Sequence, residues 1–424
     1  MPADRTPRHY VNTHVAYHAT SPVREIPDRH EGKAPEEGVA LCLSGGGYRA
    51  MLFHLGALWR LNELGYLKKL ARVSSVSGGS IAAGVLGYAW DRLVFDEKGR
   101  ASQDSFRQHV VEPLFRLGGK NIDVRSIVAG MLPCKSAAGC LEAHYEKHLF
   151  HQATLAALPV AIENEARRAP RFIINATSVQ TGALFRFSRE YLADWHIGIA
   201  RHRQDIPLAR AVAASSAFPP VLSPLTMKLN ETDFEPEPGT KHDLDDVRFK
   251  TEQVLTDGGV YDNLGLETAY KRYKTILCSD AGQALEVEVA PAHDWIRHGI
   301  RTSLAMFGQV CALRKRQLIS AFEQTTRTGA YWGIASDVAS YQHSKRLVDP
   351  IIVIGHDDAL KLAATPTRLK AMPEPWRWAL VDWGYVICDT AMRAHADGVE
   401  RNKPALLPSG KASDAKWQLP DPPT

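Results

Sequence analysis

Short apolar runs alternate with amphipathic stretches along the first ninety residues of the chain. Residues 39–43 are uniformly apolar and are followed, after one serine, by three glycines, which is typical of a buried strand. Residues 50–64 carry apolar side chains at helical spacing and stop before Gly65, a residue type that commonly ends helices. A second strand is expected at 73–76 and a second helix at 80–90. This order predicts a parallel sheet covered by helices.

Beyond residue 90 the pattern continues with longer helical stretches between isolated apolar runs. Residues 100–168 are expected to be mostly helical. Further elements are expected in this order: a strand at 172–177, a short helix broken by prolines at 211–220, an acidic surface loop at 230–246, a strand at 275–280 and a long helix at 293–324. The sequence therefore predicts the α/β class, with a central, mainly parallel sheet flanked by helices on both faces.

Composition and charge exclude some classes of protein. The 424 residues are 45% apolar and 23% charged, which is ordinary for a globular protein with a large core. The formal net charge of +4 and the lack of dense Lys/Arg runs argue against nucleic-acid binding. The start of the chain lacks the apolar core of a signal peptide, and no uninterrupted apolar run reaches about 18 residues. We therefore predict a cytoplasmic protein whose contact with the inner membrane face is peripheral.

A glycine-rich loop, Ser44–Arg49, connects the first expected strand to the first expected helix. The backbone N–H groups of Gly45, Gly46 and Gly47 can bind an oxyanion or a phosphate. A nucleotide-phosphate loop is the competing interpretation, but neither the Walker pattern nor a clean G-x-G-x-x-G is present. Arg49 falls in the first helical turn, where the helix dipole disfavours a cation. Its charge is therefore expected to pair with a carboxylate or to hold the loop near an anionic group.

The segment Ser75–Gly79 reads Ser-Val-Ser-Gly-Gly and lies between an expected strand and an expected helix. A sharp strand-to-helix turn needs small neighbours and exposes its central residue, here Ser77, as a nucleophile. The amide of Gly78, at the start of the helix, favours developing negative charge. A helix cap without chemistry is the alternative interpretation. Three other serines are rival nucleophiles, but none is central with two glycines behind it: Ser74, Ser75 and Ser80.

A base for this serine is expected at Asp257, which follows a short apolar segment and precedes Gly258 and Gly259. Glycines let the backbone turn close to a partner, so an aspartate there can accept the serine proton. Asp262 and Asn263 are nearby alternatives that are more easily interpreted as turn residues. A triad with a histidine stays open from composition, although the histidine on the helix after the glycine loop is interpreted as structural.

These segments occur together in a known family. The blocks 44–49, 75–79, 211–220 and 257–259 resemble, in content and order, those of the bacterial patatin-like phospholipases, relatives of plant patatin and of the catalytic module of cytosolic phospholipase A2. The resemblance spans about residues 39–280. In the family, aspartate is usual where Ser44 stands, and glycine is usual at the positions of Ala50 and Ser75.

The resemblance implies a Ser-Asp dyad in place of a triad, with Ser77 as nucleophile and Asp257 as base. It implies an acyl-enzyme intermediate and requires no metal or cofactor. The oxyanion would be held by the amides of four glycines: Gly45, Gly46, Gly47 and Gly78. The expected activity is the hydrolysis of acyl esters in membrane glycerophospholipids or lysophospholipids, of the phospholipase A or lysophospholipase type. Two alternatives are a binding or regulatory protein with weak or lost hydrolysis, and a lipase effector activated by a partner.

The predicted organisation has four parts: an N-terminal arm at 1–37, a patatin-like catalytic domain at 38–290, a helical part packed on it at 291–402 and a poorly ordered tail at 403–424. Acyl chains need an apolar groove, for which residues 127–132 and 304–307 are candidates, although such segments are more often plain core. The basic run 314–316 on the long helix is interpreted either as an edge that touches anionic lipid headgroups or as a solvated helix end.

Overall fold

A computed structural model describes the greater part of the chain: residues 35–122, 136–161, 169–235, 244, 246–351, 354–400, 402–415 and 419–422. Most of the predicted N-terminal arm and the apolar patch 127–132 lie outside the described residues. The first strand begins at Glu36, so the last two residues assigned to the arm belong to the sheet.

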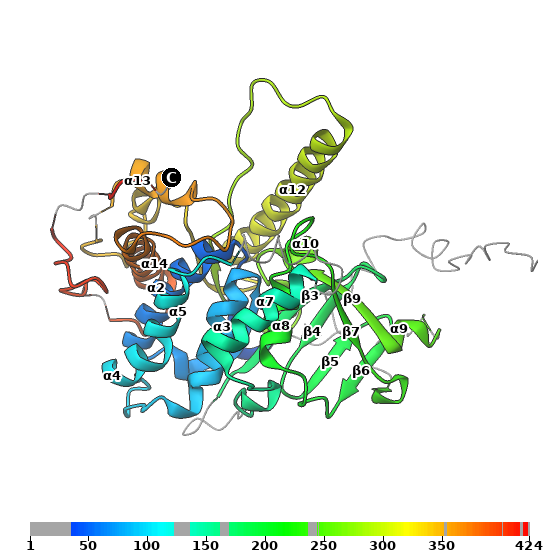
Figure 1. Ribbon diagram of the computed structural model, residues 1–424. Helices are drawn as coiled ribbons and strands as arrows, with labels where there is room; N and C mark the ends of the chain where they lie inside the picture. Colours follow the sequence, from blue (N-terminus) through cyan, green and yellow to red (C-terminus); the bar gives the residue numbers. More distant parts are fainter. Residues whose placement is uncertain are drawn as a thin grey trace, which may run out of the picture.

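The described strands form one eleven-stranded sheet, with helices packed against it (Figure 1). Its strands are β1 (Glu36–Leu43), β2 (Leu70–Val76), β3 (Arg171–Ser178), β4 (Leu184–Phe187), β5 (Tyr191–Asp194), β6 (Gly198–Arg201), β7 (Leu225–Lys228), β8 (Phe234–Glu235), β9 (Glu252–Asp257), β10 (Tyr273–Asp280) and β11 (Thr328–Gly333). The α-helices are α2 (Gly47–Glu63), α3 (Gly78–Ala89), α4 (Gln103–Phe106), α5 (Glu112–Leu117), α7 (Ala137–Tyr145), α8 (Leu208–Ser215), α9 (Arg248–Thr251), α10 (Gly259–Asp262), α11 (Glu267–Tyr270), α12 (Trp295–Glu323), α13 (His356–Ala363) and α14 (Glu374–His395).

The sheet has a parallel half and an antiparallel half. The strands β11-β10-β1-β2-β3 lie in that order and pair in parallel. Beyond β3 the pairs β3-β4, β4-β5, β5-β6 and β6-β8 are antiparallel, and β9 lies antiparallel to both β3 and β7. The predicted α/β class is confirmed, and all four strands predicted from apolar runs lie in the parallel half. The sheet as a whole is mixed, because β3 to β6 are joined by connections too short for a parallel crossover.

The helix α2 is enclosed between the sheet and α14, and it approaches α14 backbone to backbone. A Cβ added at Gly56 would come within 1.9 Å of the Val381 carbonyl oxygen, and one at Gly384 within 1.9 Å of the Phe53 carbonyl oxygen. This close contact buries both helices along most of their length. The first helix after the glycine loop is therefore held in place by a segment more than 300 residues later in the chain.

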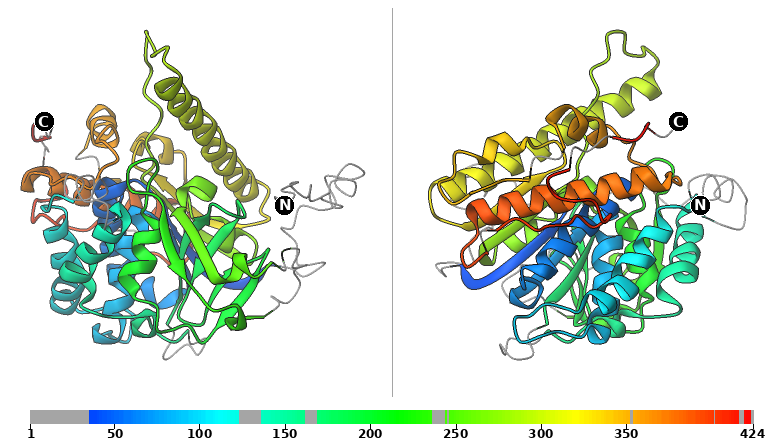
Figure 2. Two further views of the ribbon diagram at one scale, coloured as in Figure 1. Left: turned by 45° about the vertical axis from the view of Figure 1, so that its right-hand side comes forward. Right: turned by 90° about the vertical axis from the view of Figure 1, so that its left-hand side faces the viewer.

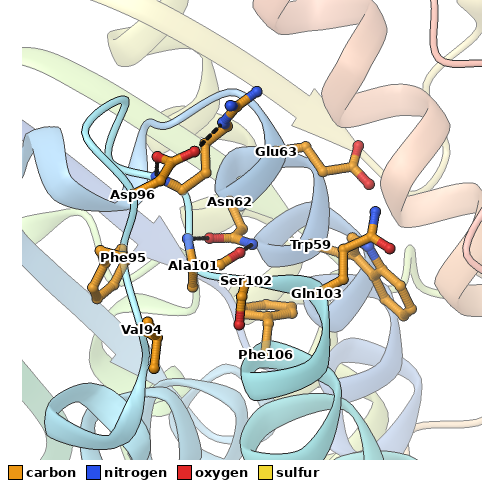
Figure 3. Close-up of a pocket in the computed structure, with 11 residues that line it drawn as sticks. Trp59, Asn62, Glu63, Val94, Phe95, Asp96, Ala101, Ser102, Gln103 and Phe106 are labelled. Carbon is orange, nitrogen blue, oxygen red and sulfur yellow. Dashed lines mark hydrogen bonds and ion pairs between the residues drawn. The ribbon is translucent and has the colours of Figure 1, made fainter.

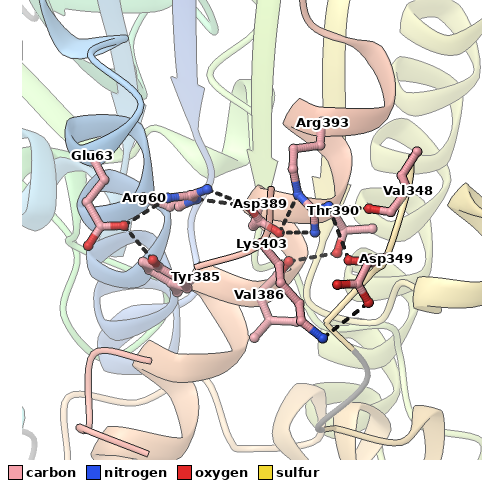
Figure 4. A network of polar contacts seen from close by, with 10 residues as sticks. All are labelled: Arg60, Glu63, Val348, Asp349, Tyr385, Val386, Asp389, Thr390, Arg393 and Lys403. Carbon is pink, nitrogen blue, oxygen red and sulfur yellow. Dashed lines mark hydrogen bonds and ion pairs between the residues drawn. The ribbon is translucent and has the colours of Figure 1, made fainter. Parts of the chain in front are cut away.

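A buried polar network joins α14 to the C-terminal end of α2 (Figure 4). Asp389 on α14 accepts from Arg60 of α2 at 2.9 Å and from Arg393 of its own helix at 2.5 Å. Arg60 also pairs with Glu63 at 2.9 Å, and Tyr385 donates to the same carboxylate. These charges are buried and mutually satisfied, so removing one of them would leave its partners unpaired.

The C-terminal part contains more than the predicted helices. The long helix expected at 293–324 is α12, but β11 follows it and extends the central sheet next to β10. Residues 403–415 of the predicted tail contact α14, where Ser409 donates to Asp382 through its backbone N–H at 3.0 Å and its hydroxyl at 2.6 Å. Leu407 of this segment is buried. Apolar and polar contacts with α14 thus position this stretch.

Candidate active site

Two helices begin at one edge of the sheet, at the carboxyl ends of β1 and β2. The turn into α2 needs glycine, because Gly46 has φ 141° and Gly47 has φ 58°. The two helix N-termini are in direct contact, since a Cβ added at Gly78 would come within 2.1 Å of the Gly47 carbonyl oxygen. Two positive helix ends therefore converge on the same point, which is a favourable place for an anion.

Ser77 forms the sharp turn between β2 and α3. Its backbone has φ 52° and ψ −122°, a conformation that costs a non-glycine residue on the order of 1–3 kcal/mol. The strain is held by Ser215, whose carbonyl oxygen and hydroxyl accept the Ser77 N–H at 3.1 Å and 3.0 Å. The Ser215 hydroxyl in turn donates to the Asn175 carbonyl at 2.6 Å. The predicted turn is present, and α8 supports it from behind.

Asp257 ends β9, which places its carboxylate beside the Ser77 turn. The side chain is buried, with its Oδ1 accepting the Gly259 N–H at 2.7 Å. Its Oδ2 is also buried and meets no further donor at normal hydrogen-bond geometry within the described residues. Burial raises the pKa of Asp257 to about 7, while the neighbouring Ser77 hydroxyl and the Gly259 amide oppose that rise. Ser77 and Asp257, which are 180 positions apart in the sequence, are thus brought together.

The four predicted oxyanion glycines do not behave alike. The amide of Gly45 already donates to the Asn263 carbonyl oxygen at 3.0 Å, so it is not available to an oxyanion. Within the described residues, no hydrogen bond occupies the amides of Gly46, Gly47 and Gly78. Of the four amides predicted from the sequence, these three are therefore available to an oxyanion, whereas that of Gly45 is held by Asn263.

Arg49 holds the glycine loop through hydrogen bonds to uncharged oxygens. Its guanidinium is buried and donates to the Ala281 carbonyl at 3.1 Å and 2.9 Å, to Gln283 Oε1 at 3.2 Å and to the Thr365 carbonyl. Burial lowers the pKa of Arg49 to about 10. The expected partner was a carboxylate or an anionic group, whereas the partners found are uncharged oxygens from two distant loops.

Two further residues pin the same loop. Ser44, which stands where the family usually has aspartate, accepts the Ala281 N–H through its hydroxyl at 2.7 Å. His54 is fully buried, and its ring nitrogens lie 2.9 Å from the Ser44 carbonyl and 2.8 Å from the Ser279 hydroxyl. Burial lowers the pKa of His54 to about 4, so the ring is neutral at physiological pH. This histidine is therefore structural, as interpreted from the sequence.

Sequence reasoning assigned no role to Ser215 and interpreted Asn263 as a turn residue, although both lie in segments singled out for their motifs. A Cβ added at Gly45 would come within 2.3 Å of Asn263 Oδ1, and one at Gly259 within 2.7 Å of it. Asn263 thus fills the space between the glycine loop and the Asp257 turn. The alternative base Asp262 is buried and caps the next turn, accepting the Leu264 N–H at 3.1 Å and the Glu267 N–H at 2.7 Å.

A cavity of about 410 Å³ lies elsewhere, near the C-terminal end of α2 (Figure 3). Its walls include Trp59, Phe95 and Phe106, and Asn62 exchanges two hydrogen bonds with the backbone of Ala101 beside it. Ser77 faces the opposite, N-terminal end of that helix. The cavity is therefore separate from the candidate active site.

A protein-family model matches the part of the chain that contains this site. The family model for patatin-like phospholipase matches residues 41–270, more than half of the chain. Among solved structures, human GIVD cytosolic phospholipase A2 is 13% identical with a TM-score of 0.44, covering 84% of this chain and 59% of its own. VipD from Legionella pneumophila is 17% identical with a TM-score of 0.34, covering 85% of this chain and 67% of its own.

ExoU of Pseudomonas aeruginosa, solved in complex with SpcU, is 16% identical with a TM-score of 0.22, covering 67% of this chain and 52% of its own. No curated protein sequence is significantly similar to the chain. The chain spans less than two thirds of the length of the human enzyme. Through the family model and the ordered motifs on which it rests, the chain belongs to the patatin-like phospholipase family.

Proposed function

We propose that this protein is a serine-dependent acyl-ester hydrolase that cleaves membrane glycerophospholipids or lysophospholipids, with Ser77 as nucleophile and Asp257 as base. The observation that carries the proposal is the placement of Ser77, on a strained turn between the free oxygen of Asp257 and two converging helix N-termini. Membership of the family supports lipid acyl hydrolysis as the general activity.

In the first step, the ionised Asp257 takes the proton of the Ser77 hydroxyl while Oγ attacks the ester carbonyl carbon. The carbonyl oxygen becomes an oxyanion, which the amides of Gly46, Gly47 and Gly78 stabilise. Loss of one such donor typically costs about 3 kcal/mol of barrier. The helix N-termini that carry these amides add a favourable field at the same position.

In the second step, the tetrahedral intermediate collapses and the bond to the leaving alcohol breaks. Asp257 returns its proton to the leaving alkoxide, and the acyl group stays on Ser77 as an ester. Asp257, ionised again, then takes a proton from a water that attacks this ester and passes that proton to the leaving Ser77 oxygen, so that the fatty acid is released and the enzyme is restored. One carboxylate serves both halves of the reaction because its pKa lies near neutrality.

A phospholipid substrate lies in a bilayer, so we also propose peripheral contact with the inner membrane face of the cell. Within the described part of the chain, none of the helices combines the length and apolarity needed to span a bilayer. Ser77 itself is 6% exposed, so an acyl chain must leave the lipid surface to reach it.

The test is labelling with a fluorophosphonate probe, together with fatty-acid release from mixed phospholipid vesicles. Wild type is compared with Ser77→Ala and Asp257→Asn. The matched controls are Ser188→Ala and Asp194→Asn, a buried serine that precedes β5 and the buried aspartate that ends it. We expect labelling and fatty-acid release by wild type and both controls, and neither in Ser77→Ala.

Labelling that survives in Ser77→Ala would show that the nucleophile is another residue. Absence of labelling in pure, folded wild type would favour a scaffold with lost hydrolysis or an effector that requires a partner. The addition of cell extract would then separate those two, because only the effector gains activity.

A further inference from the structure

The helix α12 is much longer than the strands that it connects. It connects β10 to β11, two parallel neighbours, and has 29 residues, which is about 43 Å of helix. The strand β10 has eight residues, or about 26 Å. The C-terminal part of α12 is packed, with Leu318 and Ala321 buried, whereas the N-terminal part stands out from the protein together with the loop before it (Figures 1 and 2).

The projecting part carries large apolar side chains in solvent. Trp295 is 84% exposed and Met306 is 57% exposed, while Val287 and Val289 of the preceding loop are almost fully exposed. Other exposed apolar residues on the same helix are Ile296, Ile300, Val310 and Leu313. The segment 304–307, predicted to be either core or an acyl groove, is not core, since Ala305 and Met306 are exposed and Leu304 and Phe307 are only half-buried.

The exposed side chains are arranged as an amphipathic helix. At 100° per residue, the apolar positions fall within one half of the helix circumference. The other half presents Arg297, His298, Arg301, Gln309 and Arg316. From residue 295 to residue 322 the helix contains no aspartate or glutamate. A basic amphipathic helix of this kind is typical of a membrane-surface element.

The base of α12 is fixed beside the candidate active site. Lys315 pairs with Asp280 at 2.5 Å, and Arg314 pairs with Glu267 at 2.6 Å. Asp280 also accepts the Gly282 N–H at 2.8 Å, immediately after Ala281, which contacts Ser44 and Arg49. Two members of the basic run 314–316 are therefore engaged inside the protein and do not form the predicted headgroup edge.

We propose that residues 285–313, the loop and the projecting half of α12, dock this protein into a phospholipid membrane surface. The apolar half of the helix enters the acyl layer, and Arg297 and Arg301, together with Arg316 just beyond this segment, lie at the level of the headgroup phosphates. This inference rests on the proposed function, because it supplies the route by which Ser77 meets a lipid. The inference goes beyond the proposed function by identifying the element that contacts the membrane.

Two observations favour a membrane over a protein partner. The apolar surface is convex and carries a tryptophan near its tip, so a fluid acyl layer can cover it without a matching groove. The charges on its polar half suit phosphate. The ion pairs of Arg297 with Asp294 and of Arg301 with Glu288 lie at the surface, where such pairs contribute little and can exchange for a lipid phosphate.

The experiment measures co-sedimentation of the full chain with vesicles of phosphatidylcholine, with and without phosphatidylglycerol. Ser77→Ala is the background, so that hydrolysis does not alter the vesicles. The test variant is Met306→Glu/Val310→Glu. Its matched control is Val94→Glu/Val179→Glu, two apolar positions away from α12 that are at least as exposed. We expect the test variant to lower the vesicle partition coefficient at least about tenfold and the control to leave it unchanged.

Activity is then measured with wild-type Ser77 on vesicle lipid and on a soluble short-chain p-nitrophenyl ester. The α12 variant should lose vesicle hydrolysis in proportion to binding and keep hydrolysis of the soluble ester within about twofold. A second variant, Arg297→Gln/Arg316→Gln, should weaken binding to phosphatidylglycerol vesicles by about fivefold per arginine.

Equal vesicle binding by wild type and Met306→Glu/Val310→Glu would overturn the inference. So would a wild-type dimer in size-exclusion chromatography that this variant converts to a monomer, because the apolar half would then bury a second copy. Failure of the proposed function looks different: vesicle binding that depends on α12, without hydrolysis of either substrate.

Discussion

The helices α2 and α12 occupy equivalent places in the topology, but α2 is almost entirely buried and α12 is largely exposed. Each connects two neighbouring parallel strands, β1 to β2 and β10 to β11, and each has an apolar face at helical spacing. The α2 helix matches its strands in length and is covered by α14, so almost all of it is buried. The α12 helix overshoots the sheet, and nothing among the described residues covers its first half. The contrast teaches that periodicity identifies the apolar face, whereas the length of the connection decides whether that face reaches a partner.

The largest effect is expected at the α2 side, where backbones touch. Gly78→Ala adds a Cβ that would lie 2.1 Å from the Gly47 carbonyl, so the two helix N-termini must separate. We expect kcat for a soluble ester to fall by about 10²–10³, as for the loss of one oxyanion donor. Steady-state kinetics on folded protein measure this. Unchanged kcat would mean that the Gly78 amide does not face the reacting carbonyl.

Adding a methyl group to one glycine of α2 and to one glycine of α12 compares the packing of the two helices through the free energy of unfolding, and the α2 variant is considered first. Gly56→Ala on α2 places a Cβ 1.9 Å from the Val381 carbonyl oxygen, which forces α14 away. Overpacking of this kind costs about 1–3 kcal/mol in free energy of unfolding. Urea denaturation measures it. If Gly56→Ala proved as stable as wild type, α14 would not be closely packed on α2 in solution.

The pKa of Asp257 predicts a pH dependence of smaller size. Only the ionised carboxylate accepts a proton, and its pKa of about 7 lies above the usual 3.8. We therefore expect kcat/KM to fall about tenfold per pH unit below neutrality and to level off above it. Soluble-ester hydrolysis between pH 5 and pH 9 measures this profile, and a midpoint near pH 4 would contradict it.

The raised pKa of Asp257 also affects stability, which falls with rising pH where activity increases. Between about pH 4 and pH 7 the folded state retains the Asp257 proton that the unfolded state has lost, so stability falls as pH rises through this window. Asp257→Asn removes this contribution. Its stability relative to wild type should therefore increase from pH 4 to pH 8.

The smallest effect is expected on α12. Gly308 lies in the projecting half, and an added Cβ would meet no atom within 4 Å. Gly308→Ala should therefore stabilise the protein by at most about 1 kcal/mol, the helix propensity difference, and leave soluble-ester kinetics unchanged. Strong destabilisation would show that this face of α12 is packed in solution.

The sequence predicted features that depend on local patterns. Four of the five strands of the parallel half, the Ser77 turn and the position of Asp257 each follow from a few adjacent residues, because apolar runs and glycine turns carry their own signal. The partners of Arg49 did not follow, since they are carbonyl oxygens of Ala281 and Thr365, more than 230 residues away. The amide of Gly45 was misjudged for the same reason, because its acceptor belongs to Asn263.

The sequence analysis also did not predict the short strands in the antiparallel half of the sheet. Its strands β4, β5 and β6 have only four residues each, too few to establish a period of two. The strand β11 was also missed, because its six residues include two glycines, which weaken a strand pattern. These elements form because β3 and β10 already offer edges on which they pair.

Because α12 projects beyond the sheet, its length can change independently of the rest of the fold. The loop leaves the sheet after β10, and the helix returns to the same edge, so the projecting part is an excursion from one place in the fold. Whole turns can be added to or removed from such an excursion without changing strand order, the Asp257 turn or the contact of α2 with α14. The reach and apolarity of the projection can therefore vary between relatives, or be exchanged by design, while the chemistry at Ser77 stays the same.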